Sequence, residues 1–238
     1  MGIVRKTAAE RFGPDKKVQN DMLGSFVAHG MTMEEAESEI LMQIMAGSDT
    51  TATGIRMTLL HVISNPRVLA RLRAELDEAG ILSRPPERII SDAEAREELP
   101  YLQAIIKEGL RIHPPIAGLL LKKVPEGGDT FKGVYLPAGT DIGSCAWGLM
   151  RRREVFGEDA EEFRPERWLF VQDDGVDESR VEERRRKLRE MEGTVELIFS
   201  YGRWQCLGKS IALMELNKVF VEVSDVTVPA FRAKPRNN

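Results

Sequence analysis

The sequence predicts a mainly α-helical fold with a minor β part, from three observations along its 238 residues. Apolar residues recur at the spacing of a buried helix face over several long stretches. Proline or glycine marks the ends of these stretches, as is common at helix boundaries. Between residues 116 and 136 the pattern changes to two short apolar runs, 116–124 and 131–136, separated by Gly127-Gly128, which is typical of a β hairpin.

The longest predicted helix covers about residues 33–64. Thr32 and Glu35 fit a capping box at its start, because the Thr32 hydroxyl can accept from the Glu35 amide while the Glu35 side chain reaches back. Apolar residues continue at helical spacing up to Asn65-Pro66, where proline prevents continuation. A helix of roughly 30 residues is about 45 Å long. Residues 1–31 are expected to form a loop with short helical pieces.

Three shorter helices are predicted downstream, over residues 66–79, 91–112 and 207–223. Within the second, residues from about 99 to 112 carry the pattern Glu-x-x-Arg. The residues expected to face inward in the first two are Val68, Leu69, Leu72, Leu76, Leu102, Ile105, Ile106 and Leu110. Residues 151–198 are rich in charge and are expected to be irregular, with the run 182–187 most simply a solvated helix or an insertion.

The composition is that of a soluble globular protein, with 42% apolar and 30% charged residues. The formal net charge of -4 argues against a nucleic-acid partner. Two cysteines, Cys145 and Cys206, are too few for a disulfide framework, so we expect a reducing compartment. The three histidines lie far apart, which argues against a zinc site. No apolar run approaches the ~20 residues that span a bilayer, and no signal peptide is visible, so we expect no membrane span in this chain.

The stretch from Ala46 to Gly54 weakens the long helix at its middle, because it contains two glycines, one aspartate and three threonines. Taken alone, these residues favour a break into two helices over one continuous, weakened helix. In the second interpretation a threonine bonds back to a carbonyl one turn earlier and opens a groove beside the backbone. Gly47 would then let a flat ligand approach closely, and Asp49 with Thr50 would offer an acid and an alcohol for proton delivery.

Glu108 and Arg111 place a carboxylate and a guanidinium on one helix face, a pair that is common on protein surfaces and weak by itself. A third member is available downstream, because Arg167 in Phe-Arg-Pro-Glu-Arg-Trp could complete a Glu-Arg-Arg cluster. Two planar guanidinium groups suit one shared carboxylate, and a buried cluster would lock distant segments together.

Cys206 lies between Gly202 and Gly208, just before a predicted helix. The positive end of the helix dipole and free backbone amides favour a thiolate there, and a thiolate is a metal ligand. A lone cysteine considered by itself is more often a buried, inert residue.

In chain order, four patterns resemble the signature set of the cytochrome P-450 family, most closely its fungal microsomal members. They are Ala46-Gly47-x-Asp49-Thr50-Thr51, Glu108-x-x-Arg111, Phe163-x-Pro165-Glu166-Arg167-Trp168 and Phe199-x-x-Gly202-x-x-x-Cys206-x-Gly208. In an unrelated helical protein, four such patterns in this order would need four accidents. The resemblance covers roughly residues 15 to 220. It implies a single partial domain over 1–238, the C-terminal half of the family's fold, with a haem-ligand loop at 199–208 and a divergent tail at 221–238.

The resemblance implies that haem b (iron protoporphyrin IX) is bound and that one oxygen atom of dioxygen is inserted into a small apolar organic substrate. Electrons would come from NADPH through a flavoprotein reductase, docked on the cysteine side with the help of Arg203 and Lys209. Cys206 would be the proximal iron ligand, whose thiolate donation favours O–O cleavage. Asp49 and Thr50 would serve proton delivery. The other cofactor-binding residues implied are Ala46, Gly47, Phe199, Gly202, Arg203 and Gly208.

The remaining residues that the resemblance assigns are structural or lie near the substrate. Glu108, Arg111 and Arg167 would form the structural cluster on the haem side of the core. One side of the substrate pocket would be lined by Pro115, Ile116, Ala117, Gly118 and Leu119. Cys145 matches no family motif.

The sequence departs from the family's pattern in two ways. Trp204 stands where the family usually places a basic residue that reaches a haem propionate, although Arg203 is adjacent. Family members are also much longer, and microsomal members are anchored at the cytosolic face of the endoplasmic reticulum by a segment that this sequence lacks. The shorter length supports an alternative function, an inactive fragment that binds haem weakly or acts only as an interaction module.

Overall fold

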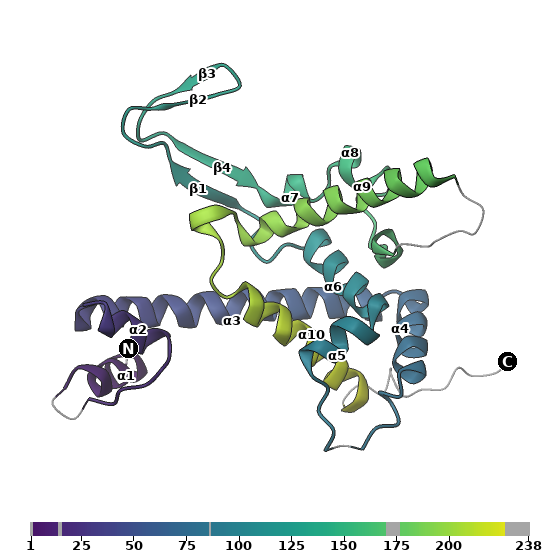
Figure 1. The fold of residues 1–238 in the computed structure, drawn as a ribbon, viewed down its shortest axis with the longest axis horizontal. Coiled ribbons are helices and arrows are strands. Elements are labelled where there is room, and N and C mark those ends of the chain that lie inside the picture. The colour runs from purple at the N-terminus through teal and green to yellow at the C-terminus, as the bar shows by residue number, and fades with distance from the viewer. Residues whose placement is uncertain (1, 14–15, 86, 170–176, 227–238) are drawn as a thin grey trace. The chain divides into compact units, whose positions relative to one another are not determined.

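The computed structural model describes residues 2–13, 16–85, 87–169 and 177–226, with side chains described up to residue 223 (Figure 1). Most of these residues are helical and the strands are short, which confirms the expected fold class. Contacts divide the chain into two compact units, the N-terminal unit (Met1–Thr50) and the C-terminal unit (Thr51–Asn238). Each unit is described by itself, and a single domain over 1–238 stays a prediction.

The N-terminal unit contains α1 (Gly2–Phe12), α2 (Met22–Ala28) and the first part of α3 (Met33–Ile63). Asp21 caps α2 by accepting from the Gly24 amide at 2.8 Å, and Arg11 on α1 donates to the same carboxylate. The Thr32–Glu35 capping box is present, with the Glu35 amide 3.3 Å from the Thr32 hydroxyl oxygen. α3 is continuous through the stretch 46–54, so the expected break into two helices is wrong.

The helical core of the C-terminal unit is built from α4 (Pro66–Glu78), α5 (Asp92–Glu98), α6 (Pro100–Ile112) and α10 (Lys209–Val226), packed against the end of α3. The expected helix over 91–112 is divided at Leu99, because Pro100 has no amide hydrogen and begins a new helix. The expected inward residues of α4 and α6 are buried, and Leu69 is partly buried. α10 extends the predicted helix over 207–223 to Val226, and residues 227–238 of the expected divergent tail lie outside the described residues.

The start of α6 is fixed by a carboxylate from α4. Glu75 accepts from the backbone N–H groups of Tyr101 at 2.6 Å and Leu102 at 2.8 Å, which have no partner within the helix. Burial raises the pKa of Glu75, although these two hydrogen bonds act in the opposite direction. Ten of the thirteen residues of α6 are buried, so this helix is the centre of the unit.

α6 also passes very close to α3 at Gly109. A Cβ atom placed on Gly109 would lie 1.9 Å from the Thr58 hydroxyl oxygen, and Thr58 is fully buried. A side chain at this position therefore cannot be accommodated without moving one helix.

The strands pair differently from the expected hairpin. β1 (Leu119–Lys123) pairs antiparallel with β4 (Asp141–Cys145), while the short β2 (Asp129–Phe131) pairs with β3 (Val134–Leu136). The predicted pairing of the apolar runs 116–124 and 131–136 is wrong. Lys132 and Gly133 both adopt positive φ and form a tight turn. This turn pairs β2 with β3, and β1 therefore pairs with β4.

The segment expected to be irregular, residues 151–198, contains a long helix. The short α7 (Ala146–Leu149) precedes it. The segment has the short elements α8 (Arg153–Phe156) and η1 (Pro165–Trp168), but also α9 (Glu178–Glu196), followed by η2 (Leu197–Phe199). The expectation is wrong for α9, because Leu188, Met191 and Val195 recur at helical spacing and pack into a second apolar cluster with Trp168. The charged run 182–187 is exposed on this helix.

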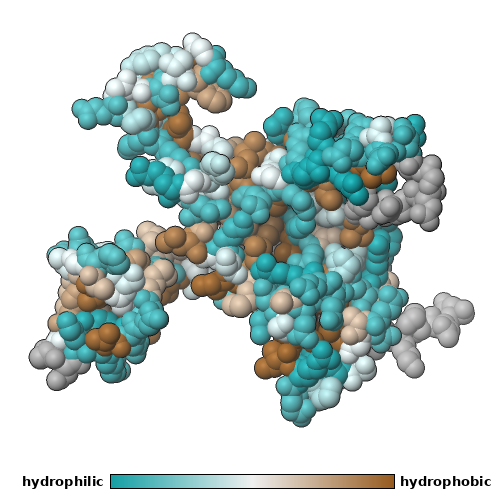
Figure 2. Space-filling model, in the orientation of Figure 1, coloured by the Kyte–Doolittle hydropathy of each residue, from teal (hydrophilic) through white to brown (hydrophobic). Residues whose placement is uncertain are grey.

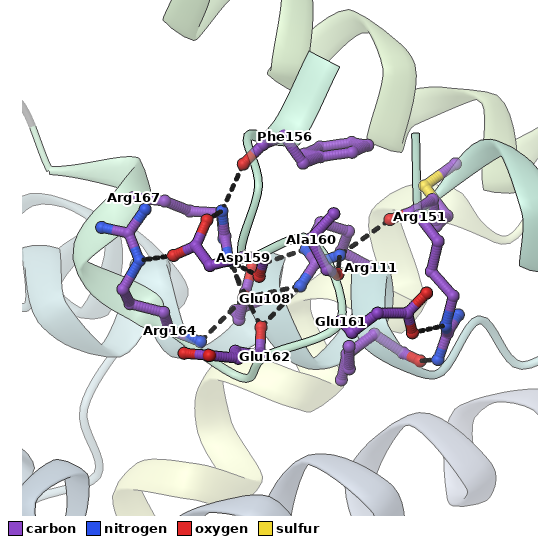
Figure 3. Close-up of polar contacts among 12 residues, drawn as sticks. Glu108, Arg111, Arg151, Phe156, Asp159, Ala160, Glu161, Glu162, Arg164 and Arg167 are labelled. Carbon is purple, nitrogen blue, oxygen red and sulfur yellow. Dashed lines mark hydrogen bonds and ion pairs between the residues drawn. The ribbon is translucent and has the colours of Figure 1, made fainter. Parts of the chain in front are cut away.

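A buried carboxylate, that of Glu108, connects α6 to the segment after the strands (Figure 3). Its Oε1 accepts from Arg111 Nη2 at 2.8 Å, from Arg167 Nε at 2.9 Å and from the Arg164 backbone N–H at 2.8 Å. Its Oε2 accepts from Arg111 Nε at 2.8 Å and from Trp168 Nε1 at 2.9 Å. The Glu108 and Arg111 side chains are 0% exposed. Five donors therefore compensate a charge that water does not reach.

The two arginines extend this network to the backbone. Arg111 donates at 2.7–2.9 Å to three carbonyl oxygens, those of Met150, Ala160 and Glu162. Arg167 donates to the Phe156 carbonyl at 2.6 Å and to Asp159 Oδ1 at 3.1 Å. Burial acts to raise the pKa of Asp159, but the hydrogen bonds and charges of Arg164 and Arg167 outweigh it and hold that pKa below its ordinary value. The network thus specifies the path of an irregular segment that has few ladder hydrogen bonds of its own.

The surface of the described residues carries apolar side chains. Figure 2 shows brown hydrophobic areas between the hydrophilic ones. Large apolar side chains that are more than half exposed include those of Leu119, Leu121, Phe131, Val134 and Leu207. Within the described ranges, no helix combines the length and the apolar character needed to cross a membrane.

Replacing Glu108 with glutamine should lower the free energy of unfolding by about 3–5 kcal/mol, because two buried guanidinium groups lose their counter-charge. The measurement is denaturant unfolding followed by circular dichroism. Glu162→Gln is the matched control, since Glu162 contributes its backbone carbonyl and its side chain is exposed. We expect this control to stay within about 0.5 kcal/mol of the parent. Equal effects of the two changes would contradict the account of the network.

Replacing Gly109 with alanine should destabilise the protein by about 1–3 kcal/mol, because the added methyl group overlaps Thr58. Gly193→Ala on α9 is the matched change, since a Cβ there meets no atom within 4 Å. It should be neutral or stabilising, as alanine favours a helix by about 0.5–1 kcal/mol over glycine. The melting temperatures of the two variants are the measurement. An equal decrease in both would show that the close approach of α6 to α3 at Gly109 does not matter for stability.

Candidate functional site

Cys206 lies in an exposed loop whose shape is set by its own backbone. The Cys206 N–H donates to the Phe199 carbonyl oxygen at 2.8 Å, which closes the loop across η3 (Gly202–Trp204). Gly202 adopts φ 61°, a left-handed conformation that glycine enters without strain, and Ser200 adopts φ 62°. The cysteine side chain is exposed and precedes α10 by three residues. The loop therefore presents a thiol to the outside from a fixed backbone.

Large apolar side chains are exposed on this loop and on the first turn of α10. Leu207 is 87% exposed, Trp204 is 56% exposed and Ile211, on α10, is 55% exposed. The Gly208 position is close to the sulfur, since a Cβ there would lie 3.8 Å from Cys206 Sγ. A flat, apolar group with one metal atom matches such surroundings better than a hydrated ion does. Among the described residues, no group of three or more His, Cys, Asp or Glu side chains could hold a metal ion.

Two cations lie at the face of Trp204, the residue that departs from the family's pattern. Arg203 Cζ is 4.8 Å and Lys122 Nζ is 5.9 Å from the centroid of the Trp204 ring. Lys122 also donates to the Ser200 hydroxyl oxygen at 3.2 Å, so strand β1 is tied to the loop. The guanidinium group of Arg203 therefore lies against the Trp204 ring, which agrees with its neighbouring position in the sequence. Sequence reasoning missed Lys122, because no spacing pattern connects it to a loop 78 residues away.

The cysteine loop also contacts the helical core. Phe199 packs against the main apolar cluster, and Lys209 Nζ lies 5.7 Å from the centroid of its ring. Lys209 in turn donates to Glu196 at 2.7 Å. The predicted residues Phe199, Gly202, Arg203, Cys206 and Gly208 are thus brought together in one loop of the C-terminal unit.

The predicted residues of α3 lie in the N-terminal unit. The Thr50 hydroxyl donates to the Ala46 carbonyl oxygen at 2.7 Å, one turn earlier, as the weakened-helix interpretation expected. This bond removes a carbonyl from the solvent and leaves the Thr50 oxygen free to accept a further hydrogen bond. A Cβ on Gly47 would meet no atom within 4 Å, and Asp49 is exposed. Cys206 belongs to the C-terminal unit, and a site shared by these residues and Cys206 stays a prediction.

The other predicted sets have different surroundings. Glu108, Arg111 and Arg167 meet in the buried network, to which the structure adds Trp168 and Asp159. The indole N–H of Trp168 could have been anticipated from its place after Arg167. The carbonyl acceptors could not, because every residue carries one. Pro115 is half-buried near Gly54, while Ile116 to Leu119 are exposed, and their substrate contact stays a prediction.

The sequence is similar to known proteins over nearly the whole chain. The family profile described as Cytochrome P-450 matches residues 5–223. Cytochrome P-450 monooxygenase ABA1 of Pyricularia oryzae is 49% identical over 223 residues, which are 94% of this chain and 41% of the relative. Its namesake aba1 of Botryotinia fuckeliana is 42% identical over 226 residues, with the same shares. Pisatin demethylase of Fusarium vanettenii is 34% identical over 231 residues, 93% of this chain and 40% of the relative.

The chain spans about two fifths of the length of the curated relatives it matches. The family profile nonetheless covers most of this sequence, including the cysteine loop, the Glu108 network and the middle of α3. The resemblance found in the four motifs is confirmed, and the chain belongs to the cytochrome P-450 family.

Proposed function

We propose that the protein is a haem-dependent monooxygenase that inserts one oxygen atom of dioxygen into an apolar organic substrate. The observation that carries this proposal is the exposed Cys206 thiol, held in a loop by the Cys206–Phe199 backbone hydrogen bond. Haem b bound through this sulfur supplies the activation of dioxygen, with electrons from NADPH through a flavoprotein reductase.

Cys206 would bind the iron as a thiolate. The loop presents the sulfur from a fixed backbone, three residues before the start of α10. The exposed apolar side chains of Leu207 and Trp204 would pack against the porphyrin and exclude water from the sulfur. Lys122 and Arg203 provide positive charge at the edge of the same loop, where propionate groups need partners.

Asp49 and Thr50 would serve proton delivery in the reaction. The Thr50 hydroxyl donates to the Ala46 carbonyl, so its oxygen can accept a hydrogen bond from water or from a reacting group. The Asp49 carboxylate is exposed and can exchange protons with solvent. Ala46 and Gly47 carry little or no side chain, which allows a flat cofactor to approach the helix.

Reductase docking on the cysteine side would use Arg203, which is exposed, and Lys209, which is partly buried by its ion pair with Glu196. As in the microsomal members of the family, we propose the cytosolic face of the endoplasmic reticulum as the place of action. Residues 115–119 would line one side of the substrate pocket.

A second candidate function is that of a fragment which binds haem weakly or serves as an interaction module. The exposed apolar side chains on the strands and on the cysteine loop favour it, since such surface promotes association. Haem uptake with a thiolate-type spectrum favours the first candidate, and absent uptake favours the second.

The test is a carbon-monoxide difference spectrum of the reduced chain after reconstitution with haem. We expect a thiolate-type shift of the Soret band in the parent protein and its loss in Cys206→Ala. Cys145→Ala is the matched control, because Cys145 is the other exposed cysteine and should leave the spectrum unchanged. A shift that survives in Cys206→Ala would refute the assignment of the ligand. Failure of the parent to take up haem would favour the second candidate.

A further inference from the structure

A cavity of about 490 Å³ lies within the C-terminal unit, lined by residues of α6, α9 and α10. This volume falls in the range of small-molecule sites, ~300–1,000 Å³. Its walls are largely apolar, formed by Ile106, Leu110, Trp168, Val195, Phe199 and Leu213. Neither Cys206 nor the candidate substrate residues 115–119 line it, but Phe199 and Lys209 do, so the cavity adjoins the cysteine loop without containing the thiol.

Positive charge predominates among the ionisable residues of this cavity. Three cations, Arg96, Lys107 and Lys209, face two acids, Glu192 and Glu196. Lys107 pairs with Glu192 at 2.5 Å and Lys209 pairs with Glu196 at 2.7 Å. Both acids of the lining are therefore engaged by its lysines, and the third cation, Arg96, has its partner, Asp92, outside the lining.

Arg96 can exchange its present partner for another anion. It pairs with Asp92, one turn earlier on α5, at 2.9 Å, and its side chain is 46% exposed. An exposed ion pair within one helix contributes little. Asp92 also accepts from Asn217 at 2.7 Å, so it keeps a hydrogen-bond donor when Arg96 turns away.

Gly193 leaves space on the α9 wall of the cavity. It lies inside a helix, where glycine is unfavourable, and its φ is outside the left-handed region. A Cβ there would meet no atom within 4 Å, so no neighbouring group of the chain requires a glycine. The backbone of α9 is therefore open to a ligand at this exposed position.

We propose that this cavity binds a small amphipathic acid, with its apolar body against the Ile106–Leu213 walls beside Gly193 and its carboxylate at Arg96 and Lys107. The apolar walls exclude a fully hydrated anion, and the exposed, exchangeable ion pair of Arg96 favours an acid over an alcohol or an amine of the same length.

The test is calorimetric titration of the 238-residue chain with decanoate, with decanol as the uncharged analogue. We expect saturable binding of decanoate at one site and at least tenfold weaker binding of decanol. Gly193→Leu, which fills the cavity with a good helix former, should weaken decanoate at least tenfold. Glu190→Leu is the matched control, because it adds the same side chain to an exposed position of α9 outside the lining, and it should bind as the parent does.

Two further variants test the proposal even if Gly193→Leu fails to fold. Arg96→Gln and Lys107→Gln change partly exposed side chains, and circular dichroism should show the parental helix content. Each should weaken decanoate several-fold and leave decanol unchanged. No binding by the parent, equal affinity for decanoate and decanol, or unchanged affinity in both glutamine variants would each overturn the proposal. None of these readouts requires haem, so their failure is distinguishable from failure of the proposed function.

Discussion

Burying a carboxylate is costly unless every oxygen lone pair is matched by a donor, and the Glu108 side chain, which is 0% exposed, meets that condition. Five N–H groups reach it, from its own helix and from a segment 56–60 residues away. The network is specific as well as strong. The planar guanidinium groups of Arg111 and Arg167 donate in fixed directions, so they fit only one arrangement of the surrounding backbone carbonyls. A segment with few regular hydrogen bonds thereby acquires a single path.

The influence of this network extends to the cysteine loop through packing. Trp168 donates to Glu108 and also belongs to the second apolar cluster, which contains Val195 of α9. Ile198 packs partly against both clusters, and its neighbour Phe199 accepts the hydrogen bond from Cys206. A charge buried beside α6 is thus linked, by consecutive contacts, to the position of the proposed iron ligand.

The sequence predicted most helices because their apolar spacing is local information. Apolar periodicity predicted α3, α4, α10 and the residues of α6. The Glu-Arg-Arg cluster was predicted because two planar guanidinium groups suit one shared carboxylate. The strand pairing was wrong, because the turn at Lys132-Gly133 competes with the more obvious Gly127-Gly128. α9 was anticipated only as a solvated helix or an insertion over residues 182–187, because Leu188, Met191 and Val195 are few among its charges. α3 is continuous over residues 46–54 although poor helix formers favoured a break there. The unfavourable helix propensity of a few residues is small compared with the cost of ending one helix and starting another.

Three parts of the site could not be read from the sequence at all. The contact of Lys122 with Ser200 and Trp204 depends on the register of β1 with β4. The backbone acceptors of Arg111 and Arg167 depend on the path of the chain rather than on residue type. The cavity beside Gly193 depends on how α9 lies against α6 and α10. In each case the determining quantity is a tertiary distance, to which no residue pattern corresponds.

The central claim, that the Glu108 network positions the cysteine loop, is tested most directly by hydrogen exchange at the Cys206 amide. Trp168→Phe removes the indole N–H from Glu108 and keeps an aromatic ring in the second cluster. A hydrogen bond to a charged group contributes about 1.5–3 kcal/mol, so exchange at Cys206 should become roughly tenfold faster or more. The Ser25 amide, which donates to Asp21 in the N-terminal unit, should keep its rate. An unchanged rate at Cys206 would show that the loop holds its shape independently of the buried network.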